Sequence, residues 1–238
     1  MIPKDCFNVI ETKEPTGKGK LDNIQVSVKD CICVKGMQSA GGSAILQGYK
    51  PLFNATVINK ILEQGATIIG KTTQDEFGYG SFNTNVPDCF PIPKNPHDKE
   101  RVCGGSSGGS AAATAQIDNH IALAESTGGS IVCPAAFCNV VGLCPTYGRV
   151  SRYGLLDYAN SLDKIGPMAK SVKECATMLS IIAGNDELDS TSSKEPVEDY
   201  ESYCGKDIKG MKVGVIKESL GEGVSQEVKD AFQDQIKL

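Results

Sequence analysis

The spacing of apolar residues switches repeatedly between a period of two and a period near 3.6, and this restricts the fold more than any other feature of the chain. Alternating residues or short apolar runs predict strands at 24–28, 66–69, 121–124 and 211–216. Helical spacing predicts helices at 57–62, 172–182 and 228–236, and the small residues 110–113 predict a tightly packed helix after a glycine-rich turn. Strands that alternate with helices predict an α/β architecture.

Residues that begin and end helices support these boundaries. Ser171 and Ser225 precede helical segments and are predicted N-caps. Gly65 and Gly184 follow helical segments and are predicted to end them. Residues 185–210 are polar and acidic, so we expect a surface connection there.

Composition and charge exclude several classes of protein. With 40% hydrophobic and 22% charged residues, the chain is an ordinary globular sequence with no apolar run as long as a membrane span. The net charge is −5, and the sequence has no basic patch of the kind that a free-standing nucleic-acid binder shows. Residues 1–5 lack the basic and apolar stretches of a signal peptide. We therefore expect a cytoplasmic protein, or an organelle-matrix protein if the source is eukaryotic.

The 10 cysteines are predicted to be free thiols, because no signal for secretion accompanies them. A zinc site would need ligands at characteristic spacings, and there is no C-x-x-C pair. The residues that come nearest are Cys31, Cys33, Cys133, Cys138, Cys144, His97 and His120. We predict no metal site, and we interpret most cysteines as small buried apolar residues.

Residues 65–72 (Gly-Ala-Thr-Ile-Ile-Gly-Lys-Thr) match the phosphate-loop pattern letter for letter. That motif needs a strand before its first glycine and a loop whose N–H groups turn toward phosphates. Here a predicted helix precedes Gly65, and the middle residues are predicted to form a buried strand that would occupy those N–H groups. We interpret the segment as a helix–turn–strand connection, with nucleotide binding as the minor alternative.

Residues 104–110 (Gly-Gly-Ser-Ser-Gly-Gly-Ser) contain the nucleophile-elbow pattern G-x-S-x-G twice, around Ser106 and around Ser107. An α/β-hydrolase also needs an acid and a later histidine from a distant loop. The only later histidine is His120, which follows the predicted helix too closely. The pattern therefore argues against a Ser-His-Asp hydrolase.

A third glycine-containing segment, residues 127–130 (Thr-Gly-Gly-Ser), follows a predicted strand. Two glycines before a serine let the backbone approach a substrate closely and turn its N–H groups toward one point. An oxyanion hole has this requirement. Taken alone, the pattern also fits an ordinary turn.

Together these segments resemble the amidase signature family. The resemblance is carried by Val28-Lys29-Asp30, by residues 104–110 and by residues 127–130, and Ser106 and Ser130 lie 24 positions apart, as in the family. Within the family the chain is most similar to the A subunits of glutamyl-tRNA(Gln) or aspartyl-tRNA(Asn) amidotransferases. The segments that indicate this are 71–77, 95–98, 145–154 and 161–167.

The resemblance implies a fold and a set of roles. It implies a mixed β-sheet covered by helices on both sides. Ser130 would attack the amide carbonyl, Ser106, next to a cis peptide bond, would relay the proton, and Lys29 would be the base in its neutral form. The backbone at Thr127, Gly128 and Gly129 would bind the oxyanion. A serine hydroxyl needs such a neighbouring base, and a lysine can be one only where burial disfavours its ammonium form.

The resemblance also implies a substrate and partners. Glutamine would be the substrate, and the ammonia would pass to partners of the same complex, namely the B and C subunits, or an archaeal-type equivalent of the first. This chain would need no cofactor, while ATP and Mg²⁺ would be bound by the partner, which would also hold the tRNA. No membrane is involved in these roles.

The sequence departs from the family pattern in three residues and in length. Ser126, Val132 and Cys144 replace an aspartate, an arginine and a lysine that are usual in the family. The family core is roughly twice as long, so we expect residues 1–238 to be a single amidase domain without its C-terminal part. Two alternatives follow: a stand-alone amidase for another amide, and a catalytically silent fragment or scaffold.

Overall fold

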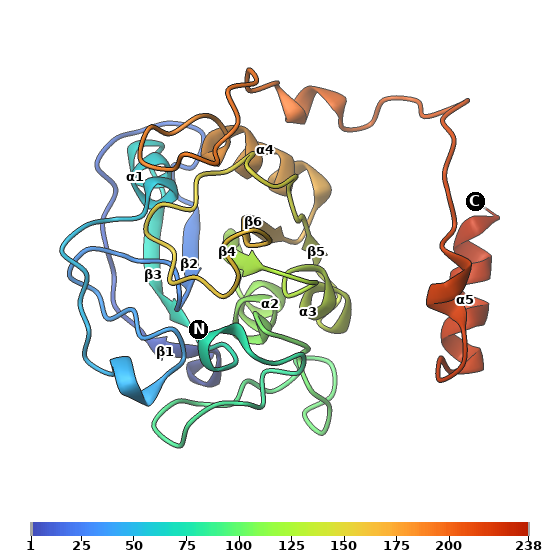
Figure 1. The fold of residues 1–238 in the computed structure, drawn as a ribbon, viewed down its shortest axis with the longest axis horizontal. Coiled ribbons are helices and arrows are strands. Elements are labelled where there is room, and N and C mark those ends of the chain that lie inside the picture. The colour runs from blue at the N-terminus through green and yellow to red at the C-terminus, as the bar shows by residue number, and fades with distance from the viewer. Residues whose placement is uncertain (1, 238) are drawn as a thin grey trace. The chain divides into compact units, whose positions relative to one another are not determined.

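The computed structural model describes residues 2–237. The chain divides into two compact units, Met1–Cys204 and Gly205–Leu238. The first unit contains strands β1–β6 and helices α1–α4 (Figure 1). The strands are β1 (Phe7–Val9), β2 (Gln25–Lys29), β3 (Thr67–Thr72), β4 (His120–Ser126), β5 (Val141–Gly142) and β6 (Lys164–Ala169). The helices are α1 (Thr56–Glu63), α2 (Gly108–Gln116), α3 (Val132–Phe137), α4 (Val172–Ile182) and, in the second unit, α5 (Gln226–Ile236).

The strands form one six-stranded sheet in the order β1-β3-β2-β4-β6-β5. Strand β2 is parallel to both of its neighbours, whereas β4 and β6 are antiparallel. The mixed sheet confirms the predicted fold class. Because β2 and β4 are adjacent and central, the residues at their carboxyl ends lie at the same edge of the sheet.

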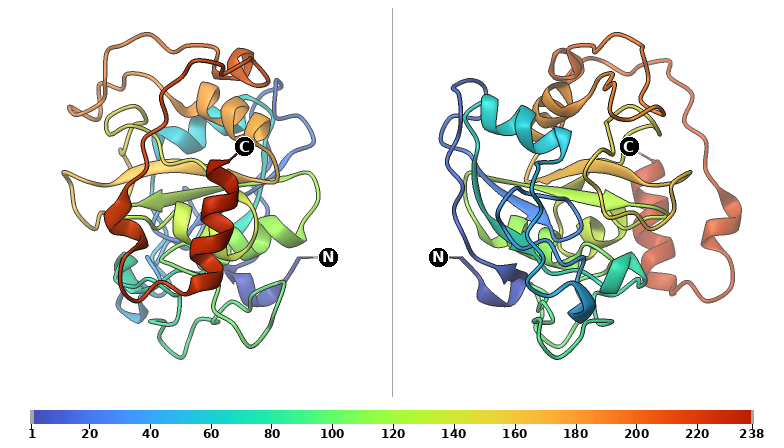
Figure 2. Two further views of the ribbon diagram at one scale, coloured as in Figure 1. Left: turned by 90° about the vertical axis from the view of Figure 1, so that its right-hand side faces the viewer. Right: turned by 60° about the vertical axis from the view of Figure 1, so that its left-hand side comes forward.

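Helices cover both faces of this sheet, as predicted. Helices α1 and α4 lie on one face and α2 on the other (Figure 2). Helix α4 begins with a capping box, in which the Ser171 hydroxyl and the Glu174 carboxylate each accept a backbone N–H. This pairing stabilises a helix start by about 1 kcal/mol. The predicted N-cap at Ser171 is therefore confirmed.

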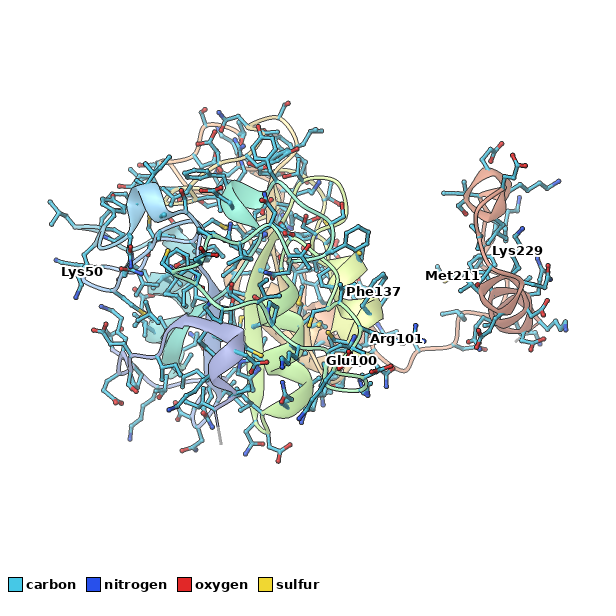
Figure 3. All side chains as sticks on the ribbon, turned by 90° about the horizontal axis from the view of Figure 1, so that it is seen from below. Lys50, Glu100, Arg101, Phe137, Met211 and Lys229 are labelled. Carbon is cyan, nitrogen blue, oxygen red and sulfur yellow. The ribbon has the colours of Figure 1, made fainter. Side chains whose placement is uncertain are left out.

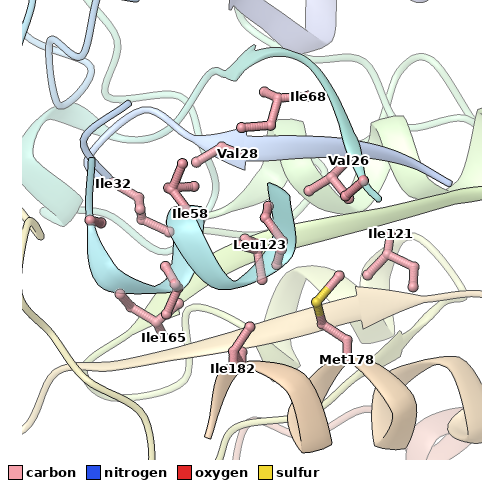
Figure 4. Packing of buried hydrophobic residues seen from close by; sticks show 14 of the residues in the cluster. Val26, Val28, Ile32, Ile58, Ile68, Ile121, Leu123, Ile165, Met178 and Ile182 are labelled. Atoms are coloured by element: carbon pink, nitrogen blue, oxygen red, sulfur yellow. The ribbon is translucent and has the colours of Figure 1, made fainter. Parts of the chain in front are cut away.

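The main core lies between the sheet and the α1–α4 layer. Val26, Val28 and Leu123 from the strands meet Ile58 of α1 and Met178 of α4 (Figure 4). Each such side chain contributes about 1.5–3 kcal/mol when it is fully buried. Packing against this layer fixes the positions of β2 and β4, and therefore the positions of the residues at their ends.

The opposite face of the sheet is buried as well. Ala111, Ala112 and Ala113 of α2 have no exposed surface, and these small side chains let the helix lie close to β2 and β4. Ser27 and Lys29, two polar residues at alternate positions of β2, are consequently also fully buried. That face is therefore an interior, and a lysine in it needs partners.

The second unit contains α5, whose first turn is capped by the Ser225 hydroxyl, which accepts the N–H of Val228. The strand predicted at 211–216 is wrong, because these residues pair with no strand among the residues described. A strand needs the N–H and C=O groups of a neighbour, and an alternating apolar pattern does not supply them. Met211, labelled in Figure 3, is 70% exposed.

All ten cysteines are free thiols, as predicted. Burial raises the pKa values of several, including Cys6, Cys31 and Cys33, because desolvation disfavours the thiolate. Within residues 2–237, no helix has the length and apolarity needed to cross a lipid bilayer.

Candidate active site

Lys29, the last residue of β2, is fully buried and has three oxygen atoms within hydrogen-bond distance of its Nζ. Its Nζ lies 2.7 Å from the Ser106 Oγ, 2.8 Å from the Glu125 Oε2 and 3.1 Å from the Glu125 carbonyl oxygen. The contact with Ser106 joins two residues that the sequence analysis placed together. Full burial and these three contacts hold Nζ beside Ser106.

Ser106 lies in the glycine-rich turn before α2 and follows a cis peptide bond from Gly105, as the family resemblance implied. A side chain at Gly105 is excluded, because a Cβ there would lie 2.3 Å from the Asp75 Oδ2. Asp75 ties this turn to the neighbouring loop. Its N–H donates to the Ser106 carbonyl oxygen, and its carboxylate accepts the N–H groups of Asn83 and Asn85.

Ser130 opens onto a pocket of about 540 Å³ beside this turn. The pocket lining includes the predicted oxyanion residues together with the glycine turn: Gly78, Gly80, Ser81, Gly105, Thr127, Gly128, Gly129, Ser130, Cys133, Tyr158 and Leu162. Lys29 and Ser106 are fully buried and are not among the lining residues. Among the residues described, Ser130 makes no hydrogen bond to Ser106, so the structure brings Lys29 to Ser106 but leaves the Ser106–Ser130 step without a direct bond.

The turn that carries Ser130 is fixed at both ends. The Gly129 N–H donates to the Ser126 Oγ at 3.0 Å, and Lys164 Nζ donates to the Thr127 carbonyl oxygen at 2.9 Å. Gly129 has φ of 139°, a conformation that favours glycine. Within residues 2–237, the N–H groups of Gly128 and Ser130 have no acceptor. These two N–H groups are free to donate to a ligand, whereas the Gly129 N–H is already used.

Sequence reasoning missed Glu125 and Asp163, both buried carboxyls linked to this site. Glu125 contacts Lys29 through its Oε2, and Asp163 contacts the Thr127 Oγ1 at 2.6 Å. A signal for Glu125 was present, because it is the one acidic residue at the end of the apolar run 121–124. An unpaired charge is not buried in a strand, so that position predicted a partner.

The other sequence patterns take no part in this site. The segment 65–72 is a turn followed by β3, and the N–H groups of Ala66, Thr67 and Ile68 all donate to backbone carbonyls. The interpretation as a helix–turn–strand connection is confirmed. His120 is buried at the start of β4 and its ring nitrogens have no partner among the residues described.

Of the three residues that depart from the family pattern, Ser126 and Val132 flank the turn in the sequence. Ser126 is buried and supplies the Oγ that holds Gly129. Val132, at the start of α3, is 46% exposed. Cys144 is also exposed. Ser126 therefore stabilises the turn with a neutral hydrogen bond, and no charge is left unpaired at Val132.

A protein-family model described as "Amidase" matches residues 9–238. A curated relative, the A subunit of the glutamyl-tRNA(Gln) amidotransferase of Thermoanaerobacter pseudethanolicus, is 50% identical over 235 residues, which are 99% of this chain and 47% of that protein. The chloroplastic/mitochondrial A subunit of Oryza sativa subsp. indica is 47% identical over 232 residues, or 94% of this chain and 42% of that protein.

A solved structure agrees with these sequence matches. The crystal structure of the A subunit of glutamyl-tRNA(Gln) amidotransferase from Thermotoga maritima superposes with a TM-score of 0.75 at 44% identity, over 80% of this chain and 42% of that chain. The chain therefore spans about half the length of the relatives it matches.

Proposed function

Because this chain belongs to the amidase family, we propose that it is the amide-hydrolysing part of a tRNA-dependent amidotransferase. Its substrate is glutamine, and the ammonia it releases converts Glu-tRNA(Gln) to Gln-tRNA(Gln), or Asp-tRNA(Asn) to Asn-tRNA(Asn). The names of the most similar relatives support the first of these products. The observation that carries the proposal is the 2.7 Å contact between a fully buried lysine, Lys29, and Ser106.

The residues act in a defined order. The Ser130 Oγ attacks the amide carbonyl and forms the acyl-enzyme, while its proton passes through the Ser106 hydroxyl to the neutral amine of Lys29. The proton then returns by the same route to the departing ammonia. Water repeats the attack with the same base and releases glutamate.

The oxyanion of the tetrahedral intermediate is stabilised by backbone N–H groups of the turn at 127–130. The free N–H groups of Gly128 and Ser130 are the donors that support this role. Donors of this kind contribute about 2.7–4 kcal/mol each to transition-state stabilisation. The proton relay requires Ser106 and Ser130 to come into hydrogen-bond contact when substrate binds.

Two partners complete the pathway. The B subunit, or its archaeal-type equivalent, holds the tRNA and binds ATP and Mg²⁺, and the C subunit completes the complex. This chain contributes no cofactor of its own. The complex works in the cytoplasm, or in an organelle matrix if the source is eukaryotic, as the name of the rice relative suggests.

Ammonia release from glutamine tests this function. The full chain is assayed alone and with B and C subunits, beside Ser130→Ala and beside Ser81→Ala, a second serine that lines the pocket. We expect ammonia release that disappears only in Ser130→Ala. A folded chain that releases no ammonia even with its partners contradicts the proposal and favours a silent scaffold.

A further inference from the structure

Glu125 places a second ionisable group directly against the base. Its Oε2 lies 2.8 Å from the Lys29 Nζ, and both side chains are almost fully buried. A carboxylate in this position would favour the ammonium form of Lys29, and an ammonium has no lone pair to accept a proton from Ser106. The location of one proton therefore decides whether Lys29 can act as a base.

The contacts of the other carboxyl oxygen of Glu125, Oε1, indicate where that proton lies. The Thr127 Oγ1 lies 3.0 Å from the Glu125 Oε1 and 2.6 Å from the Asp163 Oδ1. A hydroxyl has a single hydrogen, so it can make a full-strength hydrogen bond to only one of the two carboxyl groups. One of the two contacts is a hydrogen bond only if a carboxyl group donates it.

Asp163 is the acceptor of the Thr127 hydrogen. Its Oδ2 already accepts the N–H groups of Tyr158 and Ala159, at 2.8 and 2.9 Å. Three donors converge on this fully buried side chain, and its two oxygens accept all of them without needing a hydrogen of their own. The shorter of the two Thr127 contacts is the one to Asp163, as expected for a bond to a charged acceptor. The Glu125 Oε1 must then carry the other hydrogen.

We propose that Glu125 is a protonated carboxylic acid that keeps Lys29 a neutral amine, with Thr127 and Asp163 as positioning residues that hold the proton on Glu125. With this placement Ser106 donates to the lysine lone pair, and Lys29 donates to the Glu125 Oε2 and carbonyl oxygen. Moving the proton to Lys29 leaves the Glu125–Thr127 contact without a hydrogen. The inference rests on the proposed function only in treating Lys29 as a base.

The charged and titratable groups around Glu125 come from three sides. Lys29 belongs to β2, Cys31 follows that strand, and Asp163 and Lys164 stand at the start of β6 beside β4. Lys164 donates to the Thr127 carbonyl oxygen and not to Glu125. Lys29 is therefore the only cation in contact with the Glu125 carboxyl among the residues described.

Infrared difference spectroscopy of the full chain tests the proton directly and does not depend on activity. We expect the spectrum of the wild type minus that of Glu125→Gln, at neutral pH, to contain the C=O stretch of a protonated carboxylic acid. The matched control is Glu174→Gln, which removes an exposed carboxylate of the α4 capping box. A difference spectrum for Glu125 with carboxylate bands alone overturns the inference, whether or not the chain hydrolyses amides.

The rate at which an acylating probe labels Ser130 gives the second readout. In Asp163→Asn the amide oxygen is expected to keep the N–H groups of Tyr158 and Ala159, so the NH2 group faces Thr127. The Thr127 hydrogen then turns to Glu125, which ionises and holds Lys29 as the ammonium. We expect labelling at neutral pH to fall about a hundredfold, with the pH–rate profile shifted to alkaline pH. Adding Glu125→Gln to Asp163→Asn should recover most of the rate, because glutamine cannot ionise. A double variant as slow as Asp163→Asn overturns the inference.

The two tests separate this inference from the proposed function. If the wild type gives the infrared band of a protonated Glu125 but its Ser130 is not labelled, the proposed function is refuted and the inference about the proton on Glu125 stands.

Discussion

At the scale of single residues, the proposed chemistry depends on a lysine that has no access to solvent. Lys29 has its three oxygen neighbours within 3.1 Å, and each of them comes from a residue at a strand end or in the glycine-rich turn. Its role as a base was predicted from the family pattern. The carboxyl chain that extends from it through Glu125 to Asp163 could not be predicted, because it depends on the contact between β4 and β6.

Lys29→Met keeps the length and apolar stem of the side chain but removes the amine. We expect acylation of Ser130 to fall by about a hundredfold to ten-thousandfold, the usual contribution of a general base. The measurement is the rate of probe labelling per folded molecule.

The matched control is Lys71→Met, which changes the other fully buried lysine. Lys71 bonds to Ser39 and to the Asp30 carbonyl oxygen, and burial lowers its pKa. This variant should lose stability and keep its labelling rate. Equal loss of labelling in the two variants would contradict a specific role for Lys29.

Two glycines of the site differ in the space around them. Gly105→Ala would place a Cβ 2.3 Å from the Asp75 Oδ2, and it should cost about 1–3 kcal/mol of unfolding free energy and slow the acylation of Ser130. Gly128→Ala meets no atom within 4 Å and should stay within about 0.5 kcal/mol of the wild type. Chemical denaturation measures both. A Gly105→Ala variant as stable as Gly128→Ala would show that the turn adjusts freely.

At the scale of elements, the sequence predicted those that bury a periodic face. Helices α1 and α4 and strands β2, β3 and β4 were found where their apolar spacing predicted them. The failure at 211–216 has a physical cause, since the pattern of a strand says nothing about whether a neighbouring strand is present. The pairing of β4 with β6, which brings Asp163 to Thr127, was likewise invisible in the local pattern.

The start of β4 gives a prediction for pH. Burial lowers the pKa of His120 from 6.5 to about 3, with a further contribution from Lys170. The folded chain therefore keeps His120 neutral. Above pH 6.5 the histidine is neutral in the unfolded chain as well, so stability is at its full value. As the pH falls from 6.5 toward 3, only the unfolded chain takes up the proton, and stability is lost. The loss is on the order of a few kcal/mol.

His120→Leu should flatten this part of the stability curve, as measured by denaturation between neutral and acid pH. His97→Leu is the control, because His97 bonds to the Cys138 carbonyl oxygen and should leave the His120 contribution in place. If the stability of His120→Leu and that of the wild type changed in parallel with pH, His120 would take up its proton as readily in the folded chain as in the unfolded chain.

At the scale of the whole molecule, the two compact units differ in how they are built. The first contains the sheet, both clusters of buried side chains and every residue of the candidate site. Within residues 205–237 no side chain is buried. The resemblance predicted the family and the fold, and the comparisons confirm both.

A chain shortened to residues 1–204 should therefore fold by itself. Every buried side chain among the described residues belongs to the first unit, so we expect the shortened chain to keep a cooperative unfolding transition. Chemical denaturation followed by circular dichroism makes the comparison. A shortened chain that fails to fold cooperatively would mean that the second unit stabilises the first.

Activation of Ser130 as a nucleophile by Lys29 and Ser106 underlies every role proposed for this chain. Mass spectrometry of the full chain, after treatment with an amide-directed acylating probe, tests it without any partner or coupled assay. We predict one adduct, located on Ser130, that is absent from Ser130→Ala and forms slowly in Lys29→Met. A folded chain that is labelled elsewhere, or as fast in Lys29→Met as in the wild type, would contradict this activation.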